Sequence, residues 1–195
     1  MNSGKNIYRV LVVSGTQKGM DFIGELADGA IFCTRDTASN GAEARRKIME
    51  NDYHIVIVNA PLGDEFGHEL ALTAVEKVGT GVVLLVKNEL YDEISVRMED
   101  FGVLTVAKPV SRQLFFQSMK LVSASVGFCT KLAEENRKLR QKLAEQTTVS
   151  RAKCLLIEFA HMTEEQAHKY IEKQAMDSRL SKAEIASEIV RTYAE

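Results

Sequence analysis

Polar side chains follow several apolar runs in the first part of the chain, at places where parallel strands would end. Ser14 and Gly15 follow the first run, Asn59 the third and Lys108 the fifth, whereas the fourth run ends at the apolar Val86. Ligands bind at the carboxyl ends of such strands, so these residues mark where this part could do chemistry. An amide is a far weaker nucleophile than a carboxylate, and no acidic neighbour is present to hold Mg²⁺. The residues at these strand ends therefore offer neither a strong nucleophile nor a magnesium site.

A second set of polar residues lies near the C-terminal end. Arg151 and Lys153 open one predicted helix, and Ser178, Arg179 and Lys182 occupy the turn and start of another. Together they predict a small basic patch, whose chemistry is the binding of phosphate groups. The formal net charge of -2 gives no overall basic field, so any contact with nucleic acid depends on this local patch.

Five short apolar runs alternate with amphipathic stretches and position the first set of residues. Two of them, Ile55–Val58 and Val82–Val86, are apolar on both faces, as expected of strands covered by helices on each side. The pattern predicts an α/β fold with a doubly wound parallel sheet of five strands. The predicted strands are Tyr8–Val13, Ala30–Thr34, His54–Asn59, Val82–Val86 and Val103–Ala107.

One long helix is predicted from Ser111 to about Gln146, where Gly127 is the single glycine and no proline occurs. Its heptad spacing predicts a short parallel coiled coil that joins two chains, in which an asparagine at an inner position favours a two-stranded register. A solvated linker helix is the alternative. The predicted dimerisation residues are Cys129, Leu132, Asn136, Leu139 and Leu143.

Three short apolar blocks of helical spacing end the chain and predict a compact all-α unit of three helices. Residues Gln146–Ser150 break the heptad pattern and predict a hinge, with Ser150 as N-cap of the first helix. Thr163–Gln166 reads as a capping box for the second helix, and Ser181 caps the third. The predicted core residues are Ala152, Leu156, Ala167, Ile171, Ala175, Ile185 and Ile189.

Three motifs of this unit resemble those of the ANTAR domain, an RNA-binding module of bacterial transcription antiterminators. They are Ala152–Leu156, Glu164–Ala167 and Ala175–Arg179, with Cys154 where the family usually has glycine. The resemblance implies a surface that binds paired RNA stem-loops. The RNA-binding residues that it implies, with Arg151 beside them, are Lys153, Ser178, Arg179 and Lys182.

Residues 7 to about 125 resemble the receiver domain of two-component response regulators, in strand spacing and in the Lys108-Pro109 pair. The resemblance implies a flavodoxin-like fold and a cis peptide bond before Pro109. A working receiver carries two acidic residues, a phospho-accepting aspartate and a hydroxyl at the positions that follow its first, third and fourth strands. In this chain those positions hold Ser14 and Gly15, Asn59, and Val86.

No other position of this pseudo-receiver is expected to replace the missing carboxylates or the switch residues. Thr105 stands where receivers have the aromatic residue of their switch. Asp64 and Glu65 lie in the loop after Asn59, where Gly63 indicates a turn, and are expected to face solvent.

Composition excludes several classes of protein. The three cysteines lie far apart, which predicts neither a disulfide framework nor a zinc site. No apolar run reaches the roughly 20 residues that cross a bilayer, and the N-terminus lacks the apolar core of a signal peptide, so a cytoplasmic protein is expected. No metal, cofactor or enzymatic activity is expected.

As a whole the chain resembles amidase-operon-type antiterminators, which implies a non-enzymatic, RNA-binding transcription antiterminator that acts as a dimer without phosphorylation. Its expected partners are tandem RNA hairpins, a second copy of the chain, and a regulatory protein in place of phosphorylation. The predicted domains are a pseudo-receiver at 1–122, a coiled-coil helix at 123–147 and an ANTAR domain at 148–195.

Four alternatives remain open at this level. The first is a protein adaptor without RNA affinity, which the near-neutral net charge favours. The others are a regulator phosphorylated at unusual acceptors, a DNA-binding helix-turn-helix unit, and a nucleotide site at Ser14–Gly19, whose glycine spacing fits neither of the common phosphate-binding loops.

Overall fold

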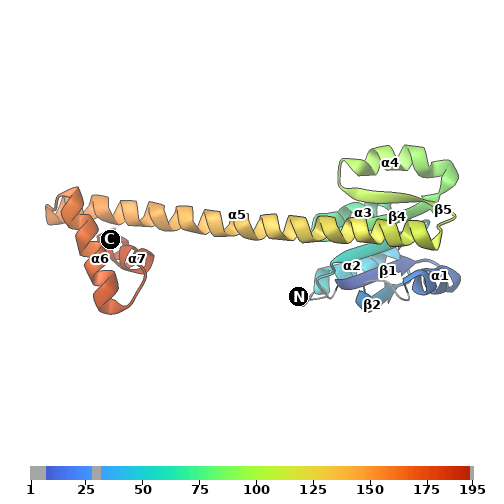
Figure 1. Ribbon diagram of the computed structural model, residues 1–195, viewed down its shortest axis with the longest axis horizontal. Coiled ribbons are helices and arrows are strands. Elements are labelled where there is room, and N and C mark those ends of the chain that lie inside the picture. Colours follow the sequence, from blue (N-terminus) through green and yellow to red (C-terminus); the bar gives the residue numbers. More distant parts are fainter. Residues whose placement is uncertain (1–7, 28–31, 194–195) are drawn as a thin grey trace. The chain divides into compact units, whose positions relative to one another are not determined.

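The computed structural model describes residues 8–27 and 32–193 (Figure 1). The chain divides into two compact units, one ending at Leu132 and one beginning at Ala133. Within the described ranges, no helix combines the length and the apolar character that crossing a membrane requires.

The first unit is built on one parallel sheet, with strand order β2-β1-β3-β4-β5. β2 pairs on one side of β1 and β3 on the other, so the carboxyl ends of β1 and β3 lie side by side at the point where the strand order reverses. This confirms the predicted five-stranded, doubly wound sheet. The strands are β1 (Tyr8–Ser14), β2 (Phe32–Ala38), β3 (Ile55–Asn59), β4 (Gly81–Lys87) and β5 (Val103–Lys108).

Helices cover both faces of this sheet, because alternate side chains of each strand are apolar on opposite faces. Val10 and Val12 pack in one cluster with residues of α1 and α5, whereas Leu11 and Val13 pack in the other with residues of α2, α3 and α4. A short 3-10 turn, η1 (Asn88–Leu90), precedes α4. The helices of this unit are α1 (Gln17–Ala27), α2 (Gly41–Glu50), α3 (His68–Val75), α4 (Tyr91–Glu99) and the first part of α5 (Arg112–Ala160).

The predicted end of the second strand at Thr34 is wrong, because β2 continues to Ala38. The added residues include Arg35 and Asp36, which an apolar pattern does not select. β2 is an edge strand, where side chains face solvent and polar residues are tolerated. The predicted start, Ala30, lies outside the described residues.

Helix α5 is continuous from Arg112 to Ala160, so the predicted hinge at Gln146–Ser150 and the N-cap at Ser150 are wrong. The threonines of this stretch stay helical by donating their hydroxyls to carbonyls one turn back: Thr147 to Leu143 at 2.9 Å and Thr148 to Ala144 at 3.0 Å. No glycine or proline interrupts the helix here. The loss of apolar periodicity therefore alters which side chains the helix presents on its surface, but the backbone stays helical.

The second unit packs the end of α5 against α6 (Glu164–Ser178) and α7 (Lys182–Tyr193). All seven predicted core residues are buried in one cluster, together with Ala186. The capping box is also confirmed, because the Thr163 hydroxyl accepts the Gln166 N–H at 3.3 Å and the Gln166 side chain accepts the Thr163 N–H at 2.8 Å. Ser181 caps α7 in the same way, with Glu184 as its partner.

Candidate functional site

Ser14 and Asn59 meet at the carboxyl ends of β1 and β3. The Asn59 Nδ2 donates to Ser14 Oγ at 3.0 Å, and Ser14 Oγ donates to the Thr16 carbonyl at 3.2 Å. Ser14 is 1% exposed. A buried serine and a half-buried asparagine thus form a hydrogen-bonded pair of neutral groups at positions where a receiver needs carboxylates.

The start of α1 closes over this pair. A Cβ built on Gly19 would lie 2.4 Å from Ser14 Oγ and 2.5 Å from Asn59 Nδ2, and one built on Gly15 would lie 2.9 Å from the Gly63 nitrogen. These distances are shorter than van der Waals contact, so a larger residue at Gly19 would have to displace the Ser14 and Asn59 side chains, and one at Gly15 would have to displace backbone. The loop from Ser14 to Gly19 thus packs on the Asn59 amide and does not form an open phosphate cradle.

Lys108 reaches the same edge of the sheet, where its ammonium donates to the carbonyl of Ala60, next to Asn59. Burial lowers the pKa of Lys108, and the nearby charge of Lys87 lowers it further. The Lys108-Pro109 peptide is cis, as the resemblance implied. Lys108 thus has a backbone oxygen as partner in place of an acidic pocket.

Two positions that form the switch in receivers hold residues of another type in this chain. Val86, at the end of β4, is fully buried, and Thr105, on β5, is 8% exposed. The Thr105 hydroxyl is the one buried side-chain polar atom without a hydrogen-bond partner among the described residues. No hydroxyl–aromatic relay is present at these positions.

The two acidic residues after Asn59 bind α2. The Asp64 carboxylate accepts the N–H groups of Gly41 and Ala42 at 2.9 and 3.0 Å, and these bonds lower its pKa. Glu65 pairs with Arg45 through two bonds of 2.7 and 2.8 Å. The expectation that both face solvent holds for Asp64 but not for Glu65, whose side chain is 19% exposed.

Restoring only the acceptor will not restore phosphorylation. We expect the Asn59→Asp variant, treated with acetyl phosphate and Mg²⁺, to keep its intact mass, because Ser14 and Gly15 supply no carboxylate to hold the metal. Wild-type protein and a reaction without Mg²⁺ serve as controls. A Mg²⁺-dependent phosphoryl adduct on the variant would contradict this reading of the site.

In the second unit, a groove of about 670 Å³ brings together Lys153 of α5 and Lys182 of α7. Lys142 and His168 line the same groove, and Glu145 is its one acidic side chain. Three lysines and one carboxylate thus line the groove, and two further carboxylates, Glu164 and Glu172, pair with Lys153 and Lys182 beside it. Two residues of the predicted basic patch, Lys153 and Lys182, line this groove, together with Lys142, which was not predicted.

Both predicted lysines of the groove have acidic partners. Lys153 pairs with Glu164 at 2.6 Å, and Lys182 pairs with Glu172, whose pKa it lowers. The side chains are exposed by 22% and 68% in the Lys153–Glu164 pair and by 52% and 38% in the Lys182–Glu172 pair. An exposed pair contributes about 0–1 kcal/mol, so a phosphate group displaces Glu172 from Lys182 more readily than it displaces Glu164 from the half-buried Lys153.

The other predicted RNA-binding residues lie outside the lining of this groove. Ser178 ends α6, and Arg179 follows as its C-cap with a φ of 56°. Arg151 is exposed but lies two residues before Lys153, about 200° around the helix, and so on another face of α5. The structure thus joins Lys153 and Lys182, places Ser178 and Arg179 at the α6–α7 turn, and separates Arg151.

The predicted dimerisation residues are all exposed on α5. Leu132, Leu139 and Leu143 are exposed by 49%, 66% and 65%, which is high for leucine side chains on a folded protein. Three exposed residues that were not predicted, Leu114, Leu121 and Phe128, lie seven residues apart on the part of α5 in the first unit. Their signal was a seven-residue spacing of their own, one position before the heptad series that contains Cys129.

Residues 137–190 match the ANTAR domain. Over 123 residues the chain is 29% identical to the aliphatic amidase regulator of Pseudomonas aeruginosa, a match that covers 62% of this chain and 61% of that protein. The chain thus spans less than two thirds of its relative's length.

Solved structures similar to the first unit include an adenylate cyclase from Rhodopirellula baltica, with a TM-score of 0.60 and 16% sequence identity. The match covers 68% of this chain and 98% of that chain. A CheY-like receiver domain protein from Methanospirillum hungatei has a TM-score of 0.54, 17% identity and coverage of 63% and 98%. At these identities the likeness concerns the fold alone. Together the matches define a receiver-like domain followed by an ANTAR domain, the architecture that the sequence predicted.

Proposed function

We propose that this protein is an RNA-binding transcription antitermination regulator that acts as a dimer on paired stem-loops in nascent RNA. The observation that carries the proposal is the groove of three lysines inside the region that matches the ANTAR domain. Phosphate contacts supply most of the affinity of such a surface. The likeness to an amidase regulator supports a role in controlling gene expression.

The backbone of Arg179 supports a role for its side chain. Its φ of 56° is left-handed, a conformation that favours glycine, and a non-glycine residue there costs about 1 kcal/mol. The N–H groups of Arg179 and Leu180 donate to the last carbonyls of α6, so the turn itself needs no arginine. The position carries an arginine, whose planar guanidinium recognises phosphate groups in a bidentate manner, and this supports a binding role.

The pair of Ser14 and Asn59 supports a regulator whose activity is not controlled by phosphorylation. That site holds no carboxylate, and the start of α1 fills the space above it. Input to this regulator is therefore proposed to come from a partner protein and not from phosphoryl transfer.

Replacing Arg179 by glycine should move stability and binding in opposite directions. We expect Arg179→Gly to stabilise the second unit by about 1 kcal/mol, because glycine relieves the left-handed backbone. We also expect weaker binding to a single RNA hairpin and a smaller salt dependence, by about one phosphate contact. Thermal unfolding and a salt series of RNA titrations measure the two effects.

A matched control is the Lys18→Ala, Arg46→Ala double variant, which removes two exposed cations from the first unit. It should leave RNA affinity unchanged. Unchanged affinity of Arg179→Gly, or the same loss in the control, would contradict the assignment of this residue.

The alternative function is a protein adaptor without RNA affinity. It is favoured by the ion pairs that Lys153 and Lys182 already make, which satisfy both charges within the unit. A folded dimer that binds no tandem-hairpin RNA at low salt would establish this alternative.

A further inference from the structure

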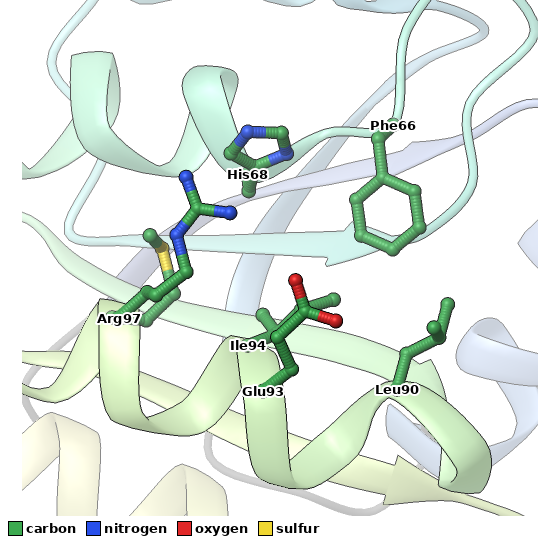
Figure 2. Close-up of a pocket in the computed structure, with 7 residues that line it drawn as sticks. Phe66, His68, Leu90, Glu93, Ile94 and Arg97 are labelled. Atoms are coloured by element: carbon green, nitrogen blue, oxygen red, sulfur yellow. The ribbon is translucent and has the colours of Figure 1, made fainter.

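A small cavity lies in the first unit, between the loop that precedes α3 and the helix α4 (Figure 2). Its volume is about 180 Å³. It is distinct from the Ser14–Asn59 pair, because none of the residues of that site lines it. The lining residues are Phe66, His68, Leu90, Glu93, Ile94, Arg97 and Met98.

The inner wall of the cavity is apolar. Phe66 and Ile94 pack against the core cluster on this face of the sheet, and Met98 is 3% exposed. An apolar cavity of about 150 Å³ holds a molecule as large as benzene. The wall of this cavity therefore fits an apolar group of about four to six carbon atoms.

The mouth of the cavity carries two opposite charges. Glu93 and Arg97 lie one turn apart on α4, and both side chains project from that helix toward His68 and Phe66 (Figure 2). Within ranges 8–27 and 32–193, neither side chain takes part in a hydrogen bond or an ion pair. A carboxylate and a guanidinium are thus both available above an apolar wall.

We propose that this cavity binds a small zwitterion, an α-amino acid with an apolar side chain of about the size of leucine. The carboxylate of the ligand pairs with the Arg97 guanidinium, its ammonium pairs with the Glu93 carboxylate, and its side chain enters the apolar wall. The Phe66 and His68 rings, with centroids 5.7 Å apart, border the opposite side. The proposal does not depend on RNA binding by the second unit.

The test is a titration of the full-length protein with leucine, followed by calorimetry and by NMR shifts. We expect saturable binding with a Kd between about 10 µM and 1 mM, the range for a ligand of this size. Leucine methyl ester lacks the carboxylate charge and N-acetylleucine lacks the ammonium, so each should bind at least about tenfold more weakly.

Two charge-removing variants assign the contacts. Glu93→Gln and Arg97→Gln should each weaken leucine binding by about tenfold or more, without a change in the melting temperature, because both side chains are exposed. Glu99→Gln on α4 and Arg46→Gln on α2 are matched controls outside the cavity and should bind leucine as wild type does. The proposal is overturned if leucine shows no saturable binding up to about 10 mM. It is equally overturned if the blocked analogues bind as well as leucine, or if the controls lose as much affinity as the cavity variants.

Discussion

Replacing Leu132 and Leu139 by aspartate will make the protein monomeric and weaken its binding to a tandem-hairpin RNA by about 10²–10⁴-fold. Both leucines occupy inner heptad positions of α5 and are exposed in the single chain, by 49% and 66%. A charge at each position opposes the seam of a coiled coil. Affinity for a single hairpin should stay nearly unchanged, because neither residue lines the lysine groove.

Analytical ultracentrifugation and RNA titrations measure the two parts of this result. The Thr130→Asp, Gln141→Asp double variant adds the same charge at outer heptad positions of the same helix, and should remain a dimer with full affinity. The avidity account fails if the leucine variant loses the same affinity for one hairpin as for two, or if it remains dimeric.

Leu156→Ala should unfold the second unit while the first unit stays folded. Leu156 is 2% exposed in a core of only eight buried residues, and truncation of such a leucine costs about 2–5 kcal/mol. A unit this small has little stability to lose. Hydrogen exchange should therefore show lost protection in α6 and α7, with the sheet unchanged, and RNA binding should disappear.

The adjacent Ile157 provides the control, because its side chain is 40% exposed. Ile157→Ala should cost less than about 1 kcal/mol and leave protection of α6 and α7 intact. Equal loss of protection in both variants, or none in either, would show that the Leu156 cluster does not hold this unit together.

The parts of the fold that follow from periodicity could be predicted. All seven core residues of the second unit were identified, because helical spacing of apolar residues reports which face is buried. The capping box at Thr163 was identified because its two reciprocal hydrogen bonds are local in sequence. The positions of Ser14, Asn59 and Lys108 followed from where the apolar strands end.

The errors have physical causes. Thr147 and Thr148 look like helix breakers in sequence, but their hydroxyls bond to the helix itself, so α5 continues. Because a hinge was assumed there, the face shared by Lys142 and Lys153, eleven residues or about three turns apart, was missed. Recognising one continuous helix would have placed both lysines in the same groove.

Contacts between segments that are distant in the sequence could not be predicted from local sequence patterns. The approach of Gly19 to Ser14 and Asn59 depends on how α1 packs over two strand ends. The cavity near Phe66 joins a loop to a helix more than twenty residues later in the chain. Neither spacing nor composition reports such packing, which depends on the arrangement of the whole layer.

The most direct test of the central claim is the affinity of the purified protein for a tandem-hairpin RNA with hexanucleotide loops, over a salt series. The Arg179→Ala, Lys182→Ala double variant is measured beside it. We predict tight binding by the wild type, which weakens as salt rises and is abolished in the variant. A folded, dimeric wild type that does not bind, or a variant that binds as well, would contradict the account.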